Sequence, residues 1–581
     1  MSKNNLSLYF SKFYAIFLIF LVACIFTESS KALALTPAQL QDAQQQNDKI
    51  QREQQIQQQE DQERALNTGR PQTNIQLPAP SLQKGKGEGC RKIKRVMLVD
   101  ATHMSKKEQA ALVAPYTGKC LGVEDIEKLM SDVTSFYINK GYVTTRIYLP
   151  AQDLSTGTLK VQIVPGKVSE IKTDEKKTQI NYLGNIFPVV EGQDLNLRDF
   201  EQGIDQINRL LSNHATIDIQ PGQEPGDSVV MINNNPDKHW HINSTLDNYG
   251  ALTTGRDQAG VTASFDNIAG LQDFTSIGLH KSLPLNDSEH QATSDNILIS
   301  VPFGYSTLTV NYNQSDYDST ITSGATNLHL NGSENTATAT LDHVVYRDQT
   351  SKASVNASLT NDITNTFIDN QLVNVSSRTL TYVTFGGNYS TQIKGGTATV
   401  GAGYSRGLRW LNAQTDPDSI GSAIPHAQFD KYTLNAGYTR PFTYDQQNLS
   451  FSSQFSGQYA PYALYGSQQF SLGGLYTVRG FLDEVLANDN GYYLRNDLTL
   501  LKSATINGNT VSFRPLVALD VGSVGSVHPG TQNGTIVGAA AGADFVVDAF
   551  DFNILAGHPV IRPGTIEDPG FNALCRLSIT F

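Results

Sequence analysis

The sequence has a deficit of positive charge. Its 581 residues include 43 Lys and Arg against 55 Asp and Glu, which gives a formal net charge of −12. A nucleic-acid-binding protein carries a basic footprint, so this balance excludes nucleic acid as a partner. The length is sufficient for several domains.

The sequence also lacks long apolar runs beyond Phe26. Every later run is interrupted within a few residues by Gly, Asn, Ser, Thr or a charged side chain. A membrane-spanning helix needs roughly 20 predominantly apolar residues, so none is predicted after Phe26. If the mature chain crosses a membrane, it must do so with β-strands.

Cysteine is scarce, with four in the whole chain. Cys575 stands alone, whereas Cys90 and Cys120 lie in one predicted domain, where a disulfide suits the oxidising periplasm. Closing that loop of about 30 residues would contribute roughly 3 to 4 kcal/mol. Metal binding by the pair is disfavoured because no His or Cys lies at ligand spacing beside either one, so no metal is predicted.

Residues 1–34 have the pattern of a secretory signal peptide. An apolar stretch from Phe13 to Phe26 follows two lysines, and Ala32-Leu33-Ala34 supplies a small-x-small cleavage site. The predicted mature chain begins at Leu35. Cys24 also fits a lipoprotein cleavage site, but the apolar run continues beyond it, and export follows on either interpretation.

The first part of the mature chain is unusually polar. Residues 35–66 are dominated by Gln, Glu, Asp, Lys and Arg and have no apolar face. Such a segment could form a helix inside a water-filled pore or remain a disordered arm, and the pattern leaves both open. Residues 67–88 contain three prolines and three glycines, the composition of a linker.

Residues 89–166 and 167–237 have the pattern of two tandem α+β domains. In the first, Ser105 and Glu108 form a capping box that predicts a helix start, and Gly141 is placed to end a second helix. The apolar helix faces are predicted to comprise Ile126, Leu129, Met130, Val133 and Tyr137 in the first domain and Phe200, Ile204, Ile207 and Leu211 in the second. Strands are predicted over 93–99, 143–149, 158–164, 168–172, 216–219 and 228–232.

In residues 238–581 helical periodicity disappears, and short alternating runs recur between polar turns. Leu308, Val310 and Tyr312, for example, alternate with Thr and Asn. This pattern is typical of a membrane β-barrel. A soluble β-sandwich has the same alternation with its apolar face inward, so alternation alone does not decide the direction.

The last predicted strand favours the barrel. Its apolar face ends on Phe581, as in the closing strand of an outer-membrane barrel, and comprises Ala573, Cys575, Leu577, Ile579 and Phe581. At roughly 20 residues per strand with its connection, this region holds about 16 strands, which leave an aqueous lumen. The predicted fold class is mainly β, a 16-stranded antiparallel transmembrane barrel after two small α+β domains and an N-terminal helix.

Short motifs are distributed over nearly the whole mature chain. They include Gly141-Tyr142-Val143-Thr144-Thr145-Arg146, Asn196-Leu197-Arg198-Asp199, Asn208-Arg209-Leu210, Asp247-Asn248, Val301-Pro302-Phe303-Gly304-Tyr305 and Val478-Arg479-Gly480-Phe481. With these motifs the chain resembles the TpsB family of two-partner secretion transporters, which are barrels with periplasmic polypeptide-transport-associated (POTRA) domains. The resemblance implies that 89–166 and 167–237 are POTRA domains and that 35–66 form a plug helix in the pore.

In that family the motif Val478-Arg479-Gly480-Phe481 lies at the tip of a loop folded into the lumen, where its Arg meets an Asp of a later strand. Asp520 is the candidate partner of Arg479. Val517 and Leu519 occupy the apolar face of that strand, which puts Asp520 on the lumen side. A guanidinium can bind a carboxylate through two hydrogen bonds, which suits it to holding a loop in a wet pore. The family usually has Phe or Gly at the position of Leu516, so the local packing departs from the pattern.

The resemblance implies a transporter in the outer membrane of a Gram-negative bacterium that exports one large partner exoprotein, captured unfolded by the POTRA domains. Further implied partners are outer-membrane lipid and the barrel-assembly machinery, with Phe581 as the C-terminal assembly signal. The family exports hemolysins, filamentous adhesins and contact-dependent growth-inhibition toxins, and some members also activate their cargo. The sequence does not identify the cargo.

Neither a phosphate-binding loop nor a metal-ligand cluster is recognisable, so no enzyme activity and no cofactor are predicted. Gly403-Tyr404-Ser405-Arg406-Gly407 fits the G-x-S-x-G pattern of hydrolases, but it lies among predicted barrel strands and not on a strand-to-helix elbow. Two alternatives remain. A passive porin would lack the POTRA domains and the Arg479 motif, and an outer-membrane insertase shares that motif but usually carries more POTRA domains.

Overall fold

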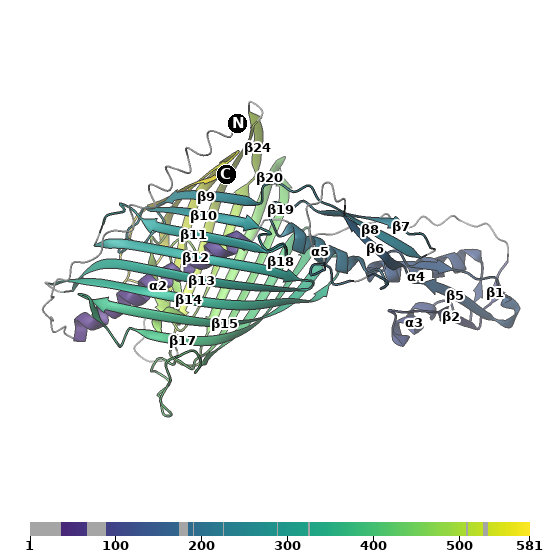
Figure 1. Cartoon of the computed structure of the whole chain (residues 1–581), viewed down its shortest axis with the longest axis horizontal. Coiled ribbons are helices and arrows are strands. Elements are labelled where there is room, and N and C mark those ends of the chain that lie inside the picture. The colour runs from purple at the N-terminus through teal and green to yellow at the C-terminus, as the bar shows by residue number, and fades with distance from the viewer. Residues whose placement is uncertain are drawn as a thin grey trace.

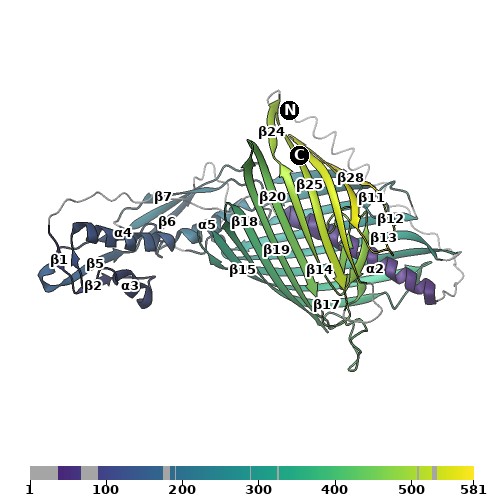
Figure 2. The same ribbon diagram turned by 180° about the vertical axis from the view of Figure 1, so that it is seen from behind.

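The computed structural model describes residues 37–66, 89–173, 184–189, 191–224, 226–287, 289–323, 326–506, 509–526 and 533–581. A large β-barrel holds helix α2 (Pro37–Leu66) inside it, and two small α+β domains project from one end (Figures 1 and 2). The predicted signal peptide at 1–34 and the predicted linker at 67–88 lie outside the described residues. Within the described part of the chain, no helix combines the length and the apolar character needed to cross a bilayer.

The barrel is closed and antiparallel throughout. β16 only extends the tip of the β15 hairpin, and β24 continues β23 beyond Leu501 along the same partner, so the described residues form 16 strands, as predicted. The elements are β9 Trp240–Asp247, β10 Gln258–Asp266, β11 Phe274–Ser282, β12 His290–Phe303, β13 Ser306–Ser323, β14 Thr326–Arg347, β15 Ser351–Ile368, β16 Gln371–Leu372, β17 Arg378–Ile393, β18 Gly396–Leu408, β19 Asp430–Tyr444, β20 Gln447–Tyr459, β23 Asn490–Leu500, β24 Lys502–Ile506, β25 Asn509–Gly525, β26 Gly534–Val547, β27 Phe550–Ile561 and β28 Asn572–Thr580.

The barrel points its apolar faces outward. On β13, Val310 is 46% exposed on the outer wall, whereas Asn311 and Asn313 are each 7% exposed on the inside. This is the reverse of a soluble sandwich, and it gives an apolar exterior around a polar lumen. The alternation in the sequence left this direction open.

The first α+β domain has a three-stranded sheet in the order β2-β5-β4 with α4 packed on it. Leu129, Val133 and Tyr137 of α4 are buried, as the helical periodicity predicted, and Ser105 caps α3 through the predicted capping box with Glu108. The elements are β1 Arg91–Lys92, β2 Arg95–Val99, α3 Lys106–Val113, β3 Cys120–Leu121, α4 Val123–Asn139, β4 Arg146–Tyr148, η1 Leu154–Thr156 and β5 Thr158–Val164.

Two strands of this domain are shorter than predicted. The strand predicted over 93–99 begins only at Arg95. The Ile93 N–H donates to the Lys119 carbonyl, whereas the Lys94 and Arg95 N–H groups both donate to the Gly157 carbonyl. The strand over 143–149 is reduced to Arg146–Tyr148, since Val143 packs against the core of the second domain.

The second domain repeats the arrangement with a sheet in the order β6-β8-β7 and one described helix. Its elements are β6 Lys167–Thr173, α5 Leu197–Asn208, β7 Thr216–Pro221 and β8 Asp227–Asn233. Phe200, Ile204 and Ile207 are buried as predicted, but Leu211 lies beyond the helix and is 37% exposed. Leu210 is the buried residue instead, because it packs against Phe274 and Leu298 of the barrel.

Candidate functional site: the plugged lumen

The segment between β20 and β23, residues 460–489, folds into the barrel and is named the lumen loop. It contains η2 (Gly466–Gln468) and an antiparallel hairpin of β21 (Phe470–Gly473) and β22 (Glu484–Asn488). Gly473 has φ +114°, a conformation that strongly favours glycine, and its N–H bonds the Thr477 hydroxyl at 2.8 Å. The hairpin therefore presents the motif at 478–481 on its tip.

Arg479 is anchored on the inner wall. Its Nε and one terminal nitrogen each lie 2.7 Å from a different carboxylate oxygen of Asp520, and its backbone N–H donates to the same carboxylate at 3.0 Å. The other terminal nitrogen lies 2.6 Å from Asp497 of β23. Asp520 is fully buried and Arg479 is 4% exposed. Such a bidentate geometry fixes the position of the loop as well as its charge.

Gly480 brings the loop backbone into direct contact with the wall. Its φ is +106°, and an added Cβ would lie 2.6 Å from the carbonyl oxygen of His558. On the wall, a Cβ at Gly538 would lie 1.7 Å from the Arg479 carbonyl oxygen, and one at Gly557 would lie 2.8 Å from the Gly480 Cα. Glycine is required on both sides of this contact.

The two apolar residues of the motif anchor the tip. Val478 and Phe481 are 0% and 1% exposed. The four consecutive residues of the motif therefore supply the ion pair, the close glycine contact and the apolar packing that hold the tip of the lumen loop. The apolar cluster around them also contains Leu472, Leu486, Val524, Ile536 and Ile566.

Helix α2 crosses the lumen and has almost no apolar side. Ala43 and Ile50 are buried against a small patch of the wall that includes Tyr317 and Leu330. Elsewhere, polar side chains of the described part of α2 bond polar side chains of the strands. These contacts are Asp48 with Arg378 at 2.7 Å, Gln55 with Glu334 at 2.5 Å, Gln57 with Gln258 at 2.8 Å and Gln58 with Ser294 at 3.1 Å.

Replacing hydrogen bonds of this kind by hydrogen bonds to water has a small net cost in free energy, so the helix is held in place but can be released from the wall. The lumen also keeps a cavity of about 1160 Å³ beside α2. Its lining is mainly Ser, Thr, Asn and Gln, with Lys352, Lys431 and Asp362 among the charged groups. The passage is therefore narrowed by the helix and remains polar.

The second α+β domain is bonded to one end of the barrel. The Arg347 side chain at the end of β14 is 2% exposed and donates to Asp205 of α5 at 2.6 Å, while Tyr305 donates to Asp199 at 2.6 Å. Burial raises the pKa of the Asp199 carboxyl, and the Tyr305 bond opposes that shift. The motifs at 196–199 and 301–305 therefore meet at this junction.

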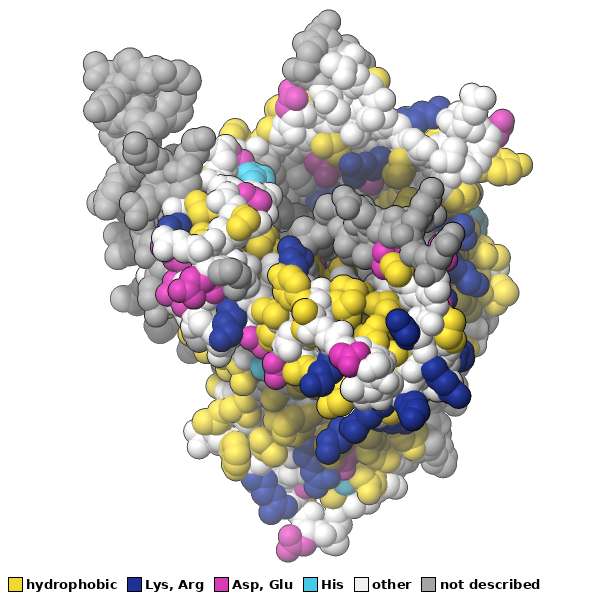
Figure 3. Space-filling model, turned by 90° about the vertical axis from the view of Figure 1, so that its right-hand side faces the viewer, with side chains coloured by type: hydrophobic (Ala, Val, Ile, Leu, Met, Phe, Trp, Pro, Cys, Tyr) yellow, Lys and Arg dark blue, Asp and Glu magenta, His cyan; other side chains and the backbone are white. Residues whose placement is uncertain are grey.

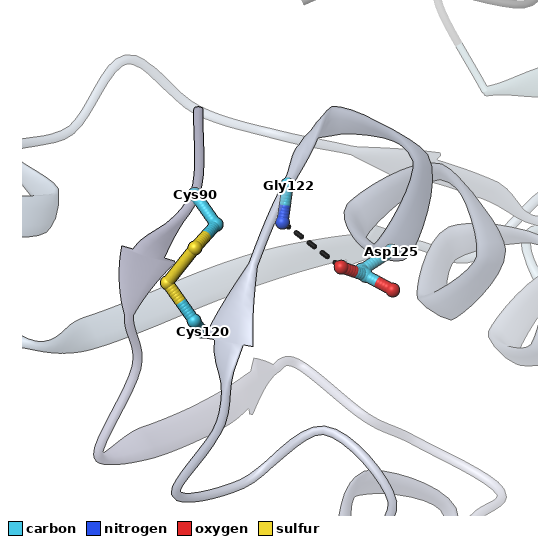
Figure 4. Close-up of a disulfide and its surroundings, with 4 residues drawn as sticks. All are labelled: Cys90, Cys120, Gly122 and Asp125. Atoms are coloured by element: carbon cyan, nitrogen blue, oxygen red, sulfur yellow. Dashed lines mark hydrogen bonds between the residues drawn. A yellow bond between two sulfur atoms is a disulfide. The ribbon is translucent and has the colours of Figure 1, made fainter. Parts of the chain in front are cut away.

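The remaining predicted site residues lie as follows. Cys90 and Cys120 are joined in a disulfide with Cα atoms 5.3 Å apart, near the start of α4, where the Gly122 N–H bonds Asp125 (Figure 4). Phe581 is 56% exposed, and its backbone continues the pairing of β28 with β9 through Ile242. Among the described residues, no group of three or more His, Cys, Asp or Glu gathers at metal-binding distance.

Several site residues were missed by sequence reasoning. Arg52, Glu484, Arg347, Arg378 and Glu334 carry contacts of the helix, the loop and the junction. For Arg378 and Glu334 a signal existed, because a charged side chain on the polar face of a barrel strand marks a lumen contact. Arg52 is one of many charges on a polar helix, and its partner lies 432 residues away.

Comparison with known proteins agrees with this architecture. Residues 226–545 match the family model "Haemolysin secretion/activation protein ShlB/FhaC/HecB", residues 92–166 match the ShlB-type POTRA domain, and residues 167–221 match a further POTRA domain model. The chain is 32% identical over 561 residues to the outer membrane transporter CdiB of Escherichia coli, covering 96% of this chain and 93% of the relative.

Other relatives and a solved structure extend this likeness. The chain is 35% identical to CdiB of Dickeya dadantii, covering 81% of this chain and 82% of the relative, and 29% identical to the hemolysin transporter ShlB of Serratia marcescens, covering 85% and 86%. The structure of CdiB from Escherichia coli superposes with a TM-score of 0.81 at 31% identity, covering 95% of this chain and all of that one. The chain therefore belongs to the ShlB/FhaC/HecB family, the outer-membrane transporters of two-partner secretion.

Proposed function

We propose that the chain exports a large exoprotein by capturing it unfolded at the POTRA domains and threading it through the barrel once α2 has left the lumen. The observation that carries this proposal is the polar seating of α2. The described part of the helix is held by a few ion pairs and by hydrogen bonds from Gln side-chain amides around one small apolar patch. A helix held in this way can leave the lumen. We propose that the exported protein belongs to one of three classes: hemolysins, adhesins or growth-inhibition toxins.

Capture at the POTRA domains is supported by their exposed edges. The outer edge of β4 is unpaired among the described strands, and Tyr148 at its end is 51% exposed. An extended chain can add to such an edge through its backbone before any side-chain pocket is needed. Figure 3 views this end of the molecule and shows Lys and Arg side chains gathered along one side.

Export in this proposal needs neither a catalytic residue nor a cofactor, and folding of the cargo outside the cell supplies the direction. We further propose that the barrel-assembly machinery inserts the chain using Phe581 and that the exposed apolar wall contacts outer-membrane lipid. We also propose the predicted domain division, with the plug at 35–66, POTRA domains at 89–166 and 167–237, and the barrel at 238–581.

The test is co-expression with a candidate partner exoprotein and measurement of its release or surface display. We expect Arg479→Ala to abolish export while the barrel still folds, as judged by heat-modifiable migration on a gel. Arg406→Ala is the control, because one terminal nitrogen of Arg406 donates to both carboxylate oxygens of Asp430, but the Arg406 side chain is half exposed. Export by Arg479→Ala at the intact level would overturn the role given to this loop.

A further inference from the structure

We propose that the lumen loop is a brace for the seam at which the barrel closes, and that Asp247, Asn248 and Arg576 form a side-chain lock across that seam. The seam is the junction between β28, the last strand, and β9, the first. In this proposal the barrel stays shut during export, and these residues position the two strands that no covalent turn connects.

The backbone pairing at the seam is short. Paired residues of β28 and β9 run only from Arg576 opposite Asp247 to Thr580 opposite Asn243, with one further step at Phe581 and a single backbone bond at Asn248. β13, in comparison, pairs with β14 along its whole length of 18 residues. Because fewer ladder hydrogen bonds hold the seam, other contacts must keep it closed.

Side-chain hydrogen bonds continue the seam beyond its paired residues. Asn248 lies just beyond the last backbone pair, where its side-chain oxygen accepts from the Cys575 N–H at 2.8 Å and its amide donates to the Ala573 carbonyl at 3.0 Å. The Asn248 backbone N–H also donates to the Cys575 carbonyl at 3.2 Å. One asparagine therefore continues the pairing where the strand backbones separate.

A buried ion pair sits next to this asparagine. Arg576 Nε lies 2.9 Å from an Asp247 oxygen, and the two side chains are 8% and 2% exposed. The Arg576 guanidinium also lies over the Tyr249 ring, 4.5 Å from its centre. A pair made across two strands and removed from water resists their separation, because opening would leave both charges without their partner.

The lumen loop supports the same junction from inside. The Asn572 side chain at the start of β28 donates to the Gly480 carbonyl at 2.8 Å. Leu475 and Leu482 of the loop pack in one cluster with Leu574 of β28 and Tyr249, the residue that follows the lock on the β9 side. The tip therefore bonds β28 directly, and it shares an apolar cluster with Tyr249, which lies just past the end of β9.

Arg479 fixes the other end of this support on β23 and β25 through Asp497 and Asp520. From there the loop passes over β26 and β27 at Gly538 and Gly557 before it reaches Asn572. The anchor and the seam are thus connected by one continuous backbone. Removing the anchor frees the tip, and with it the inner support of β28 and β9.

The experiment measures closure directly by disulfide cross-linking in the full-length chain with Cys575→Ser and the Cys90–Cys120 disulfide retained. Ser244→Cys with Ile579→Cys places two thiols at partner positions across the seam. Phe552→Cys with Leu577→Cys is the matched control across β27 and β28. Cross-linking needs no exoprotein, so its outcome is independent of whether the proposed export is correct.

We expect both pairs to cross-link in the otherwise intact chain. Arg479→Ala should lower the seam yield severalfold and leave the control yield unchanged. Asn572→Ala removes only the bond to Gly480 and should do the same, which covers the case in which Arg479→Ala fails to assemble. An unchanged seam yield, or an equal fall at the control pair, would overturn the brace.

The second arm tests whether the seam stays shut. Export of an exoprotein should be the same with the seam cross-linked and after reduction. If the seam cross-link stops export, reductant restores it and the control cross-link has no effect, the seam opens during transport and the proposal is wrong.

Discussion

Arg52 of the lumen helix and Glu484 of the lumen loop form a bidentate ion pair, with Nε and a terminal guanidinium nitrogen each 2.7 Å from a different carboxylate oxygen. The third guanidinium nitrogen donates to the Gly466 carbonyl at 2.8 Å, also in the loop. Both side chains are less than a tenth exposed. Helix and loop are therefore coupled to each other, and the loop in turn is coupled to the wall through Arg479 and Asp520.

Replacing Arg52 with Ala should loosen the plug. Removing one partner of a buried pair costs about 3 kcal/mol or more, because the remaining charge stays buried without its counterion. We expect more frequent channel openings from the variant in a planar bilayer. Lys49→Ala is the control, since Lys49 lies 3.9 Å from Glu53 and is more exposed.

The coupling can be isolated with Glu484→Ala. If the two side chains act as one pair, the double variant should open little more often than either single variant. Additive effects, or a closed channel in Arg52→Ala, would show that this pair does not hold the helix.

Gly538→Ala should dislodge the loop tip without altering any charge. The new Cβ would meet the Arg479 carbonyl oxygen, a backbone atom that cannot move without the loop. We expect a cost of about 3 kcal/mol, the upper end for overpacking, seen as a lower temperature for the heat-modifiable transition of the barrel. Gly387→Ala is matched, because its Cβ would meet only the Ser354 carbonyl, at an ordinary 3.6 Å. Equal effects of the two substitutions would contradict the close contact.

Arg347→Ala should release the second POTRA domain from the barrel. Arg347 is buried between Glu201 and Asp205 of α5, so its loss leaves two carboxylates facing the end of β14. Spin labels placed on α5 and on the barrel should then give a broader distance distribution. Arg146→Ala, exposed on β4, should leave the distribution narrow. A narrow distribution in Arg347→Ala would mean that the junction is held without it, by Tyr305 and by Arg209, which donates to the Gln272 and Ser300 carbonyls of the barrel.

The stability of α3 should depend on pH in a defined window. Hydrogen bonds from Lys140 and Ser105 hold the pKa of the Glu108 carboxyl at about 2, below its ordinary 4.5. Because the folded pKa is depressed, the stabilisation is present above pH 4.5 and is lost as the pH falls toward 2. We expect amide protection of residues 105–113, corrected for intrinsic exchange, to fall in that window.

Glu108→Gln should show little of this fall. Glu124→Gln serves as the control, because Glu124 is an exposed carboxylate at the start of α4, and it should retain the full dependence. An unchanged profile in Glu108→Gln would assign the pH dependence to another group.

Local sequence patterns predicted much of the fold and part of the candidate site. Alternation along the strands, together with the terminal Phe581, favoured a barrel, because a strand repeats every two residues whatever surrounds it. The length of the region at roughly 20 residues per strand then predicted its 16 strands. The same parity placed Asp520 on the lumen side, where the structure has it bound to Arg479. The capping box at Ser105 and Glu108 is a contact within one turn and was readable for the same reason.

Other features depended on which surfaces meet. The sequence left residues 35–66 open between a helix and a disordered arm, and a polar helix finds a place only because the closed barrel provides a polar interior. Alternation alone also left the direction of the apolar faces open, since it is the same in a sandwich and in a barrel, and only the last strand favoured the barrel.

The sequence by itself determined most of the elements and which residues of each strand share a face, because both follow from short-range periodicity. Only the tertiary structure decided that Arg52 meets Glu484, that Gly480 rests on Gly538, and that Arg576 meets Asp247 across the seam. Each of these contacts joins segments far apart in the chain, and no local pattern of residues encodes a partner brought near by closure of the barrel.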